Sequence, residues 1–419
     1  MEEWMSSHPN VCIFGLNYPP EPTGIAPYTG ALAVELSQKG YAVVAHVAQP
    51  HYPEWAIRHG FRQWVRRERV DGVEVQRRLH YVPASPRGIR RLISEVTFGL
   101  RLIFAKWGQP DVAIAVSPSL FSTALVVLRL KLATRRRPRL IVWVQDIYTL
   151  GLAETGEGSQ LSQRIMRWVE GATFRAADQV VVIHQRFASF VCREFGVDDS
   201  RVAVVRNWTH LPKMAPVDAD EARTTLDWPK GITLAVHTGN MGSKQGLENI
   251  VEAARLADVR QLPVHFLLVG DGGERASLEG LARGISRITF IDPLDDDKYR
   301  FALGAADVLI VNEKPGVSAM AVPSKLTSYF DAGRPVVGAT DPGGITATEI
   351  EAADAGVIVD AGDPEALLNT IIQLAADPEA MARFGVNGRL YRASVLDQEA
   401  AIERWSDVID HVAITGTPN

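Results

Sequence analysis

The stretch Ile232–Ala257, ITLAVHTGNMGSKQGLENIVEAARLA, decides the fold. Its apolar and β-branched start predicts a buried strand at Ile232–His237, and the periodicity of its end predicts a helix at Glu248–Ala257. The turn between these two elements contains Gly239, Gly242, Lys244 and Gly246. A buried strand that passes through a glycine-rich turn into a helix is the repeating unit of a parallel α/β sheet.

The same alternation of strand and helix patterns continues in both directions along the chain. The other strands of the first half are predicted at Val11–Gly15, Ala42–Val47, Val73–Leu79, Val112–Val116, Leu140–Gln145, Gln179–Ile183 and Val202–Val205. Those of the second half are predicted at Val264–Val269, Ile288–Phe290, Val308–Val311, Val336–Gly338 and Val357–Val359. Two consecutive series predict an α/β protein with two Rossmann-like, doubly wound domains that face one another across a cleft.

The two series are separated by a Pro-rich segment without periodicity, NWTHLPKMAPVD at residues 207–218. We therefore expect one domain at residues 1–210 and a second at residues 217–395. A final helix, at about residues 396–419, follows the last predicted strand, and we expect it to pack back on the first domain. The length of 419 residues also exceeds what one compact core usually holds.

The composition is that of a soluble globular protein, with 46% hydrophobic and 22% charged residues. Cys12 and Cys192 are the only cysteines and offer no disulfide framework, which fits a reducing compartment. The first ten residues lack the apolar run of a signal peptide, and no stretch reaches the roughly 20 apolar residues of a membrane span. We expect a cytoplasmic protein.

A basic block lies inside this chain of net charge −5, because residues 58–107 contain twelve Arg or Lys and four Asp or Glu. Within it, apolar residues from Ile89 to Trp107 follow one helical face, and basic residues lie between them. Such a helix either packs on its own domain with a solvated basic side, or lies on the anionic inner face of the cell membrane. The residues that we expect at an anionic acceptor or membrane are Arg87, Arg90, Arg91 and Arg101.

Three glycine turns are candidates for binding phosphate: Gly24, the turn at 239–246, and Gly270-Asp271-Gly272. Glycine lets backbone N–H groups and a helix N-terminus approach a phosphate closely. Each turn also has a plain interpretation as a strand-to-helix connection, which is strongest for Asp271 because Asp-Gly is a common turn pair. The first turn lacks the G-x-G-x-x-G pattern, which argues against a dehydrogenase.

A lysine in the segment VPSKLTSYFDAGRPVVG, residues 322–338, conflicts with its predicted position. Pro323 and Ser324 suit the start of a helix, so Lys325 falls in the first turn. The helix dipole disfavours a cation there unless an anion is near. Because such conflicts tend to occur at functional sites, we expect Lys325 to bind phosphate.

Two acidic positions are candidates for chemistry or metal binding. Asp146 follows a buried strand in LIVWVQDIYTL, where its carboxylate either orients a sugar hydroxyl or caps the loop. The triplet Asp295-Asp296-Asp297 resembles a metal site, but it precedes a predicted helix whose dipole favours acidic residues. We therefore expect no metal at the triplet.

These segments, in this order, resemble glycosyltransferase family 4, the retaining enzymes with the GT-B fold. The resemblance is carried by TGNMGSKQGLENIVEAA, LLVGDGGER, PSKLTSYFDAGRPVV and DAGDPEALLNTI. The stretch AQPHYPEW, residues 48–55, further resembles the group found in colanic-acid-type exopolysaccharide gene clusters. The resemblance implies transfer of a sugar from a UDP- or GDP-linked donor to a glycan or lipid-linked glycan, with retained anomeric configuration and without metal or another cofactor.

The resemblance also implies residue roles. Asp146, facing the sugars, and Lys244 and Lys325, on the diphosphate, would be catalytic. The implied donor-binding residues are Gly24, Gly239, Asn240, Gly242, Gly270, Asp271, Phe290, Asp292, Pro323, Ser324 and Ser328. Two positions depart from the family pattern: Ser328 replaces the second glutamate of a pair, which leaves Glu313 without a counterpart, and Gln145 replaces a histidine. Proton transfer by a histidine at position 145 is therefore excluded.

Two other functions match parts of the sequence. UDP-sugar 2-epimerases share two such domains, but they need carboxylates and histidines that converge on the sugar, and the motifs here offer few. A non-catalytic protein for anionic lipid or nucleic acid would use the basic block, but the block lacks a repeated aromatic-basic motif and the rest of the chain is acidic. We expect a glycosyltransferase of cell-surface polysaccharide synthesis without a nucleic-acid partner.

Overall fold

The computed structural model describes residues 8–22, 24–84, 88–133, 137–150, 160–208, 215–316 and 325–414. The chain divides into two compact units. Unit 1 comprises Met1–Trp208 together with Gln398–Asn419, and unit 2 comprises Thr209–Asp397. Each unit has its own sheet and its own hydrophobic core.

The unit 1 sheet has eight strands in the order β3-β4-β2-β1-β5-β6-β7-β8. The strands are β1 Val11–Gly15, β2 Val43–Ala48, β3 Val65–Val70, β4 Val73–Arg78, β5 Val112–Ser117, β6 Arg139–Val144, β7 Gln179–Val182 and β8 Val202–Val204. All neighbours pair in parallel except β3 and β4. The seven parallel strands lie where the sequence predicted them, to within one or two residues.

The antiparallel strand β3 corrects the prediction, which placed no strand between Val47 and Val73. Its sequence VRRERV carries four charges, and most of its residues are exposed because it lies at the edge of the sheet. The turn Asp71-Gly72 between β3 and β4 has positive φ at both residues, as tight hairpins require. An edge strand with a polar sequence gives a weak hydrophobic signal, and the basic block concealed it.

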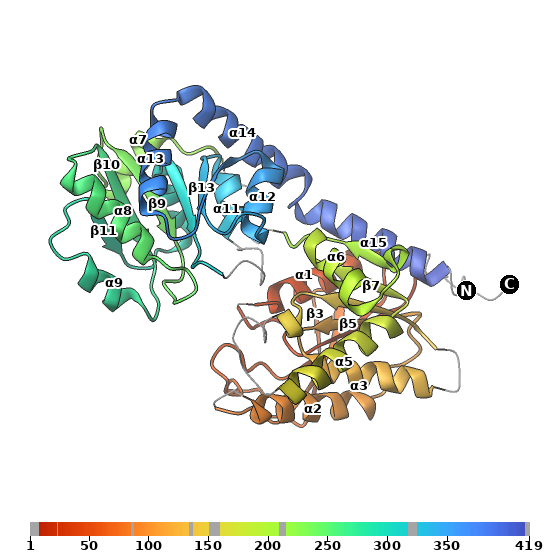
Figure 1. Cartoon of the computed structure of the whole chain (residues 1–419). Helices are drawn as coiled ribbons and strands as arrows, with labels where there is room; N and C mark the ends of the chain where they lie inside the picture. The colour runs from red at the N-terminus through yellow and green to blue at the C-terminus, as the bar shows by residue number, and fades with distance from the viewer. Residues whose placement is uncertain are drawn as a thin grey trace. The chain divides into compact units, whose positions relative to one another are not determined.

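Helices cover both faces of the unit 1 sheet (Figure 1). The helices are α1 Ala26–Gln38, α2 Ile89–Ile103, α3 Leu120–Leu132, α5 Gln160–Ala176, α6 Gln185–Phe195 and α15 Gln398–Ile414. One face packs on α1 and on the C-terminal helix α15, whose Trp405 contacts Trp143 of β6. The neighbouring helices α2, α3 and α5 lie on the other side (Figure 1).

The unit 2 sheet is wholly parallel, with six strands in the order β11-β10-β9-β12-β13-β14. These are β9 Thr233–Thr238, β10 Val264–Val269, β11 Ile288–Ile291, β12 Val308–Asn312, β13 Val336–Ala339 and β14 Gly356–Val359. The helices are α7 Ala219–Leu226, α8 Glu248–Val259, α9 Arg275–Leu281, α10 Asp296–Ala305, α11 Lys325–Ala332, α12 Ile345–Ala353, α13 Pro364–Ala375 and α14 Pro378–Ser394. One core lies under α8 and α13, and a second lies under α7, α10 and α11.

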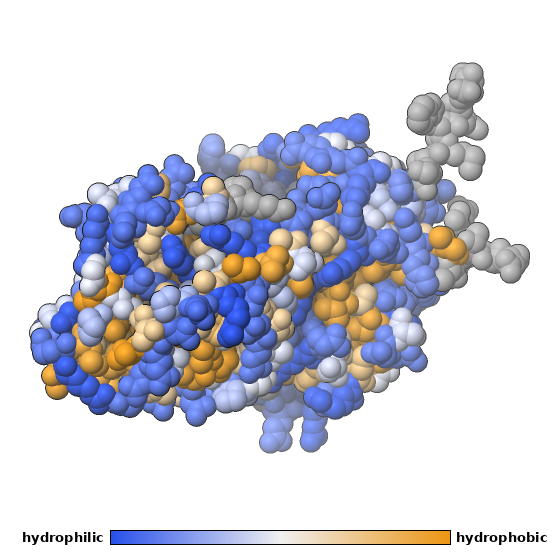
Figure 2. Space-filling model, turned by 90° about the horizontal axis from the view of Figure 1, so that it is seen from above, coloured by the Kyte–Doolittle hydropathy of each residue, from blue (hydrophilic) through white to orange (hydrophobic). Residues whose placement is uncertain are grey.

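One local feature, the start of α10, agrees with the sequence. Asp295 caps α10 by accepting a hydrogen bond from the backbone N–H of Lys298, which is the helix-start role predicted for the acidic triplet. Within the described ranges, no helix is long and apolar enough to cross a bilayer. Hydrophilic residues predominate on the face of the molecule shown in Figure 2, and apolar residues form smaller groups between them.

Candidate active site

Two glycine turns meet at the carboxyl edge of β9 and β10 in unit 2. Gly239 N donates a hydrogen bond to Val269 O, and Met241 N donates one to Asp271 O, each at 2.8 Å. Gly270 has φ +139, and a Cβ there would overlap the carbonyl oxygen of Gly239. A Cβ on Gly272 would lie 2.5 Å from Met241 O. The two turns therefore approach so closely that only glycine fits at positions 270 and 272. This requirement is additional to the backbone conformation of an ordinary Asp-Gly turn.

Lys325 is the first described residue of α11, and its side chain is partly buried beside the first glycine turn. Its ammonium nitrogen would lie 3.6 Å from a Cβ on Gly239 and lies 3.2 Å from His237 Nε2. Burial lowers the pKa of Lys325 from 10.5 to about 8, and the charge of Glu313 opposes this shift. Among the described residues, no carboxylate lies within ion-pair distance of this ammonium. The structure thus places an unneutralised cation next to a glycine turn.

Residues at the end of β12 fix the same turn. Asn312 Nδ2 donates to the carbonyl oxygens of Gln245 and Gly246 at 2.8 and 2.9 Å, while Asn312 Oδ1 accepts a hydrogen bond from Asn249. Asn312 was not predicted from the sequence, although a polar residue that ends the apolar run VLIVN is a signal for such a role. The carboxylate of Glu313, the residue left without a family counterpart, accepts hydrogen bonds from the hydroxyls of Thr340 and Thr346.

A hydroxyl network lies beneath the glycine turn. Tyr329 is fully buried on α11, and its hydroxyl accepts a hydrogen bond from Thr238 N at 2.8 Å. The hydroxyl oxygen of Tyr299 on α10 lies 3.3 Å from Thr238 Oγ1. The same hydroxyl forms a hydrogen bond with the side chain of Ser328, the residue in place of the expected glutamate. These bonds join α10 and α11 to the end of β9 and so help to hold Lys325 at the turn.

The other predicted donor residues of unit 2 are dispersed around this site. Lys244 is exposed in the first glycine turn, and its carbonyl accepts a hydrogen bond from Lys314 N at 2.9 Å. Asp271 is exposed and caps its own turn through Gly272 N. Phe290 packs against the core from β11, and Asp292 pairs with Arg275 at 2.7 Å. Asn240 and Gly242 lie in the first turn, whereas Pro323 and Ser324 lie outside the described residues.

In unit 1, Asp146 follows β6 at the carboxyl edge of the sheet. Its Oδ1 accepts a hydrogen bond from Ile147 N at 2.8 Å, and Ser117 Oγ donates to its carbonyl oxygen. The loop after Asp146 is held by Glu170, a buried carboxylate on α5 that accepts hydrogen bonds from the backbone N–H groups of Tyr148 and Thr149. Burial raises the pKa of Glu170, and these bonds oppose that shift. Nothing in the local sequence pattern distinguished Glu170 from a helix-surface glutamate.

The turn that contains Gly24 lies at the same edge, because β1 and β6 are parallel strands of one sheet. Gly24 has φ +68, which fits both a phosphate turn and a plain connection to α1. Glu21, just before it, is buried and accepts hydrogen bonds from the backbone N–H groups of His51 and Tyr52 at 2.8 and 2.9 Å. Glu21 therefore ties the turn after β1 to the segment HYPEW after β2.

The predicted arginines of the basic helix differ in their surroundings. Arg90 is exposed. Arg91 pairs with the buried Glu95 at 3.4 Å, and Arg101 lies 3.6 Å from the centre of the Trp64 ring. Two of the four arginines thus have partners within unit 1, and Arg87 lies outside the described residues.

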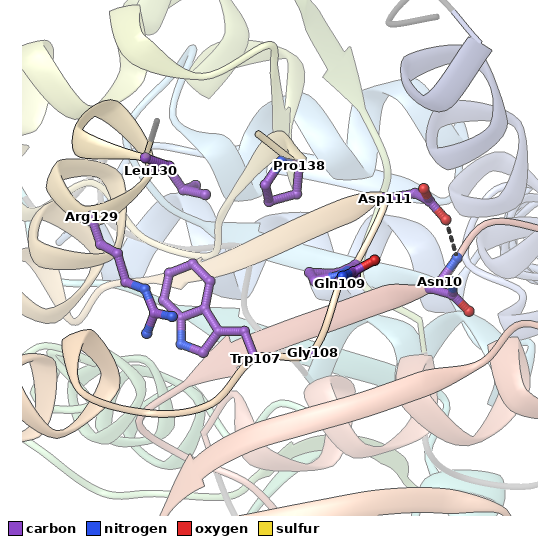
Figure 3. A pocket seen from close by; sticks show the side chains of 10 residues that line it. Asn10, Trp107, Gly108, Gln109, Asp111, Arg129, Leu130 and Pro138 are labelled. Atoms are coloured by element: carbon purple, nitrogen blue, oxygen red, sulfur yellow. Dashed lines mark hydrogen bonds between the residues drawn. The ribbon is translucent and has the colours of Figure 1, made fainter. Parts of the chain in front are cut away.

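A cavity of about 650 Å³ lies at the opposite, amino edge of the unit 1 sheet (Figure 3). Arg129, which lines it, lies over the Trp107 ring at 3.8 Å and donates to the carbonyl oxygens of Leu102, Ile103 and Ala105. Asp111 accepts a hydrogen bond from Asn10 N at 3.0 Å (Figure 3). Arg129 and Asp111 therefore stabilise the end of α2 and the start of β5. The candidate site residues of unit 1 lie at the opposite, carboxyl edge of the sheet.

Two α/β units, each built on a parallel or mainly parallel sheet, are the architecture of the GT-B class. Sucrose-phosphate synthase from Thermosynechococcus elongatus superposes with a TM-score of 0.73 and 19% identity, over 97% of this chain and 100% of that chain. HepE from Anabaena in complex with UDP superposes with a TM-score of 0.69 and 16% identity, over 96% of this chain and 100% of that chain. These likenesses confirm the predicted GT-B fold.

The sequence comparisons define the family. Residues 23–208 match the glycosyl transferase 4-like domain, and residues 233–377 match the glycosyl transferases group 1. The Escherichia coli (strain K12) protein WcaI, a glycosyl transferase assigned to colanic acid biosynthesis, is 32% identical over 338 residues, which is 77% of this chain and 81% of that protein. The chain therefore belongs to the glycosyltransferase family that these two domains define. This membership confirms the resemblance seen in the sequence, and it favours sugar transfer over the epimerase and the non-catalytic alternatives.

Proposed function

We propose that this glycosyltransferase uses a nucleoside diphosphate sugar, UDP- or GDP-linked, whose diphosphate binds at the glycine turns of unit 2. The observation that carries the proposal is the partly buried ammonium of Lys325 beside Gly239 without a carboxylate partner among the described residues. A cation that is partly withdrawn from water and has no counter-ion is unfavourable, and an incoming diphosphate would supply that counter-ion. The complex of HepE with UDP supports this donor class.

The chemistry follows from the charges that develop during transfer. Cleavage of the anomeric bond leaves negative charge on the diphosphate and positive charge on the sugar. In this proposal, Lys325, Lys244 and the backbone N–H groups of the glycine turns stabilise the departing diphosphate, so the reaction needs no metal. Retention of the anomeric configuration, which the family resemblance implies, leaves the departing phosphate available to accept the acceptor proton.

The acceptor side is assigned to the carboxyl edge of the unit 1 sheet. Asp146 would orient the acceptor hydroxyl or the donor sugar by a charge-assisted hydrogen bond. Its position is fixed indirectly by Glu170, which accepts hydrogen bonds from the backbone N–H groups of Tyr148 and Thr149 in the same loop. The similarity to WcaI supports a glycan acceptor of cell-surface polysaccharide synthesis, and we propose a lipid-linked glycan.

The outward face of helices α2, α3 and α5 supports a lipid-linked acceptor. We name it the α2–α3–α5 face. It exposes large apolar side chains, namely Ile89, Ile93, Leu100, Phe104, Leu128, Leu132, Leu161, Ile165 and Trp168. Half of the predicted apolar row of the basic helix is thus exposed, and Trp107 at its end is buried. The helix α2 packs on α3 through other residues: Gly99 lies so close that a Cβ would be 2.9 Å from Ser122 Cα.

Within the described residues of α2, α3 and α5, the exposed charges are all basic, and one of them, Arg167, pairs with Glu194 of α6 at 2.7 Å. The acidic residues of these three helices are Glu95 and Glu170, and both are buried. The exposed charged residues of the helices are Arg90, Lys131, Arg164, Arg167 and Arg175. An apolar surface whose described helical residues expose basic but no acidic side chains is complementary to an anionic bilayer. We propose that unit 1 binds the inner face of the cell membrane through it, as a cytoplasmic, peripheral enzyme.

The experiment that tests the proposed function is a thermal-shift screen with UDP-, GDP- and dTDP-sugars and the free nucleoside diphosphates. A ligand that binds only the folded state raises the melting temperature. We expect one base to stabilise the wild-type protein, and we expect no such shift in the Lys325→Met variant. The absence of stabilisation by every nucleotide would contradict the proposed donor class.

A further inference from the structure

His237 lies on β9 with its imidazole wholly buried between β12 and α11. Its Nδ1 lies 3.2 Å from the carbonyl oxygen of Ile310. A carbonyl oxygen only accepts hydrogen bonds, so Nδ1 carries the ring proton and Nε2 of the neutral ring carries a lone pair. Nε2 lies 3.2 Å from Lys325 Nζ and therefore accepts a hydrogen bond from the ammonium.

A neutral acceptor has a different effect on Lys325 from a carboxylate. A carboxylate would hold the ammonium but neutralise its charge and repel a second anion. An imidazole holds the ammonium and leaves its positive charge intact. Glu313, the acidic residue that acts on Lys325 from just after β12, directs its carboxylate oxygens to the hydroxyls of Thr340 and Thr346. The tyrosines that face this region from α10 and α11 are Tyr299 and Tyr329, and burial raises both of their pKa values, so they stay neutral.

We propose that His237 is a positioning residue that holds the ammonium of Lys325 beside Gly239 without neutralising it, so that the charge is available to the donor diphosphate. This inference rests on the proposed function, because it assumes that Lys325 binds the diphosphate. Burial and the charge of Lys325 hold the pKa of His237 well below its ordinary value, which keeps the ring neutral at physiological pH.

Removing the acceptor at position 237 would affect the titration of Lys325. A hydrogen bond to a charged form favours that form, so its loss lowers the pKa of Lys325 further below about 8. The fraction of protein with a charged Lys325 then declines at a lower pH than in the wild type. Nucleotide binding that needs this charge should weaken over the same pH range.

The test compares His237→Phe, which keeps a ring but removes the acceptor, with His237→Gln, whose amide oxygen can replace Nε2. UDP, GDP and dTDP are titrated calorimetrically into each protein between pH 6 and 9. We expect His237→Phe to raise the Kd of the binding nucleotide about tenfold or more and to shift the alkaline loss of affinity to lower pH. His237→Gln should stay within about threefold of the wild type, because its hydrogen bond is retained. If His237→Phe does not fold, as judged by its thermal transition, the smaller His237→Leu replaces it.

A double-mutant cycle separates this inference from the proposed function. In the Lys325→Met background, His237→Phe should have no further effect on the Kd, because the group that it positions is absent. If Lys325→Met weakens binding but His237→Phe matches the wild type in Kd and pH profile, the positioning role is overturned and the proposed function stands. If Lys325→Met binds all nucleotides as the wild type does, or the wild type binds none, the diphosphate assignment itself is overturned.

Discussion

The ammonium nitrogen of Lys325 lies beside Gly239, 3.6 Å from the position that a Cβ on this glycine would occupy. The two residues are far apart in the sequence, and they meet because α11 packs under the end of β9. Thr238 N donates to the Tyr329 hydroxyl, which fixes this packing one helical turn from Lys325. The charge of Lys325 and the backbone of the first glycine turn are therefore presented together at one edge of the unit 2 sheet.

Replacing Lys325 should abolish transfer. We expect Lys325→Met to lower kcat/KM for the donor by two or more orders of magnitude, about 3 kcal/mol or more of lost stabilisation of the departing diphosphate. Methionine keeps the length of the side chain, so the circular dichroism spectrum should match that of the wild type. A steady-state assay with the donor identified by the screen measures the effect, and an unchanged rate would contradict the role of Lys325.

The same substitution should stabilise the protein in the absence of nucleotide. Because burial lowers the pKa of Lys325 from 10.5 to about 8, its charged form is disfavoured in the folded state. This penalty, about 3 kcal/mol at most, is fully present below pH 8 and decreases as the pH rises toward 10.5. Melting temperatures between pH 6.5 and 9.5 should therefore be higher for Lys325→Met than for the wild type, with a difference that narrows at alkaline pH. A difference that is absent or that widens with pH would contradict the burial of a charged lysine.

The contact between the two glycine turns makes a further prediction. Gly270→Ala would place a methyl group on the carbonyl oxygen of Gly239 at φ +139, so we expect a loss of about 2 kcal/mol or more of stability and weaker nucleotide binding. Gly273→Ala is the matched control, because a Cβ there meets nothing within 4 Å. Denaturant unfolding and nucleotide titration check both variants, and equal effects at the two positions would count against the close approach.

Substitution of Glu170 should impair the use of the acceptor without changing the affinity for the donor nucleotide. Glu170→Gln replaces one carboxylate oxygen by an NH₂ group, which cannot accept the hydrogen bond of Tyr148 N or Thr149 N. We expect a higher KM for the acceptor and a kcat reduced about tenfold or more, because the loop after Asp146 loses its anchor. The Kd of the nucleotide, measured by calorimetry, should stay unchanged. A variant with wild-type acceptor kinetics would show that the loop is positioned by other groups.

The α2–α3–α5 face should bind anionic vesicles. Phe104 is 84% exposed at the end of α2, and we expect Phe104→Glu to weaken co-sedimentation with phosphatidylglycerol vesicles about tenfold or more. Val259→Glu is the control, because Val259 is 78% exposed on α8 of unit 2. Binding of the wild type should decrease with salt and be weak on phosphatidylcholine. If the two variants bind alike, or if binding does not respond to salt, unit 1 does not use this face.

Much of the fold could be predicted because buried parallel strands such as Val264–Val269 consist of apolar, β-branched residues bounded by turn signals. Strand β3 could not, since an exposed edge strand needs no apolar side chains. The conflict at Lys325 pointed to an unusual environment, and in the structure the ammonium lies partly buried between His237 and the first glycine turn. The roles of three residues were not predicted, because each acts through a contact with a residue distant in the sequence: His237, Asn312 and Glu170.

The central claim is that Lys325 and the glycine turns of unit 2 bind the diphosphate of the donor. The most direct test is a crystal structure of the protein with the nucleoside diphosphate that the screen identifies. The β-phosphate should lie within about 3 Å of Lys325 Nζ and close to the backbone of Gly239. A nucleotide bound with its phosphates away from both residues would contradict the claim.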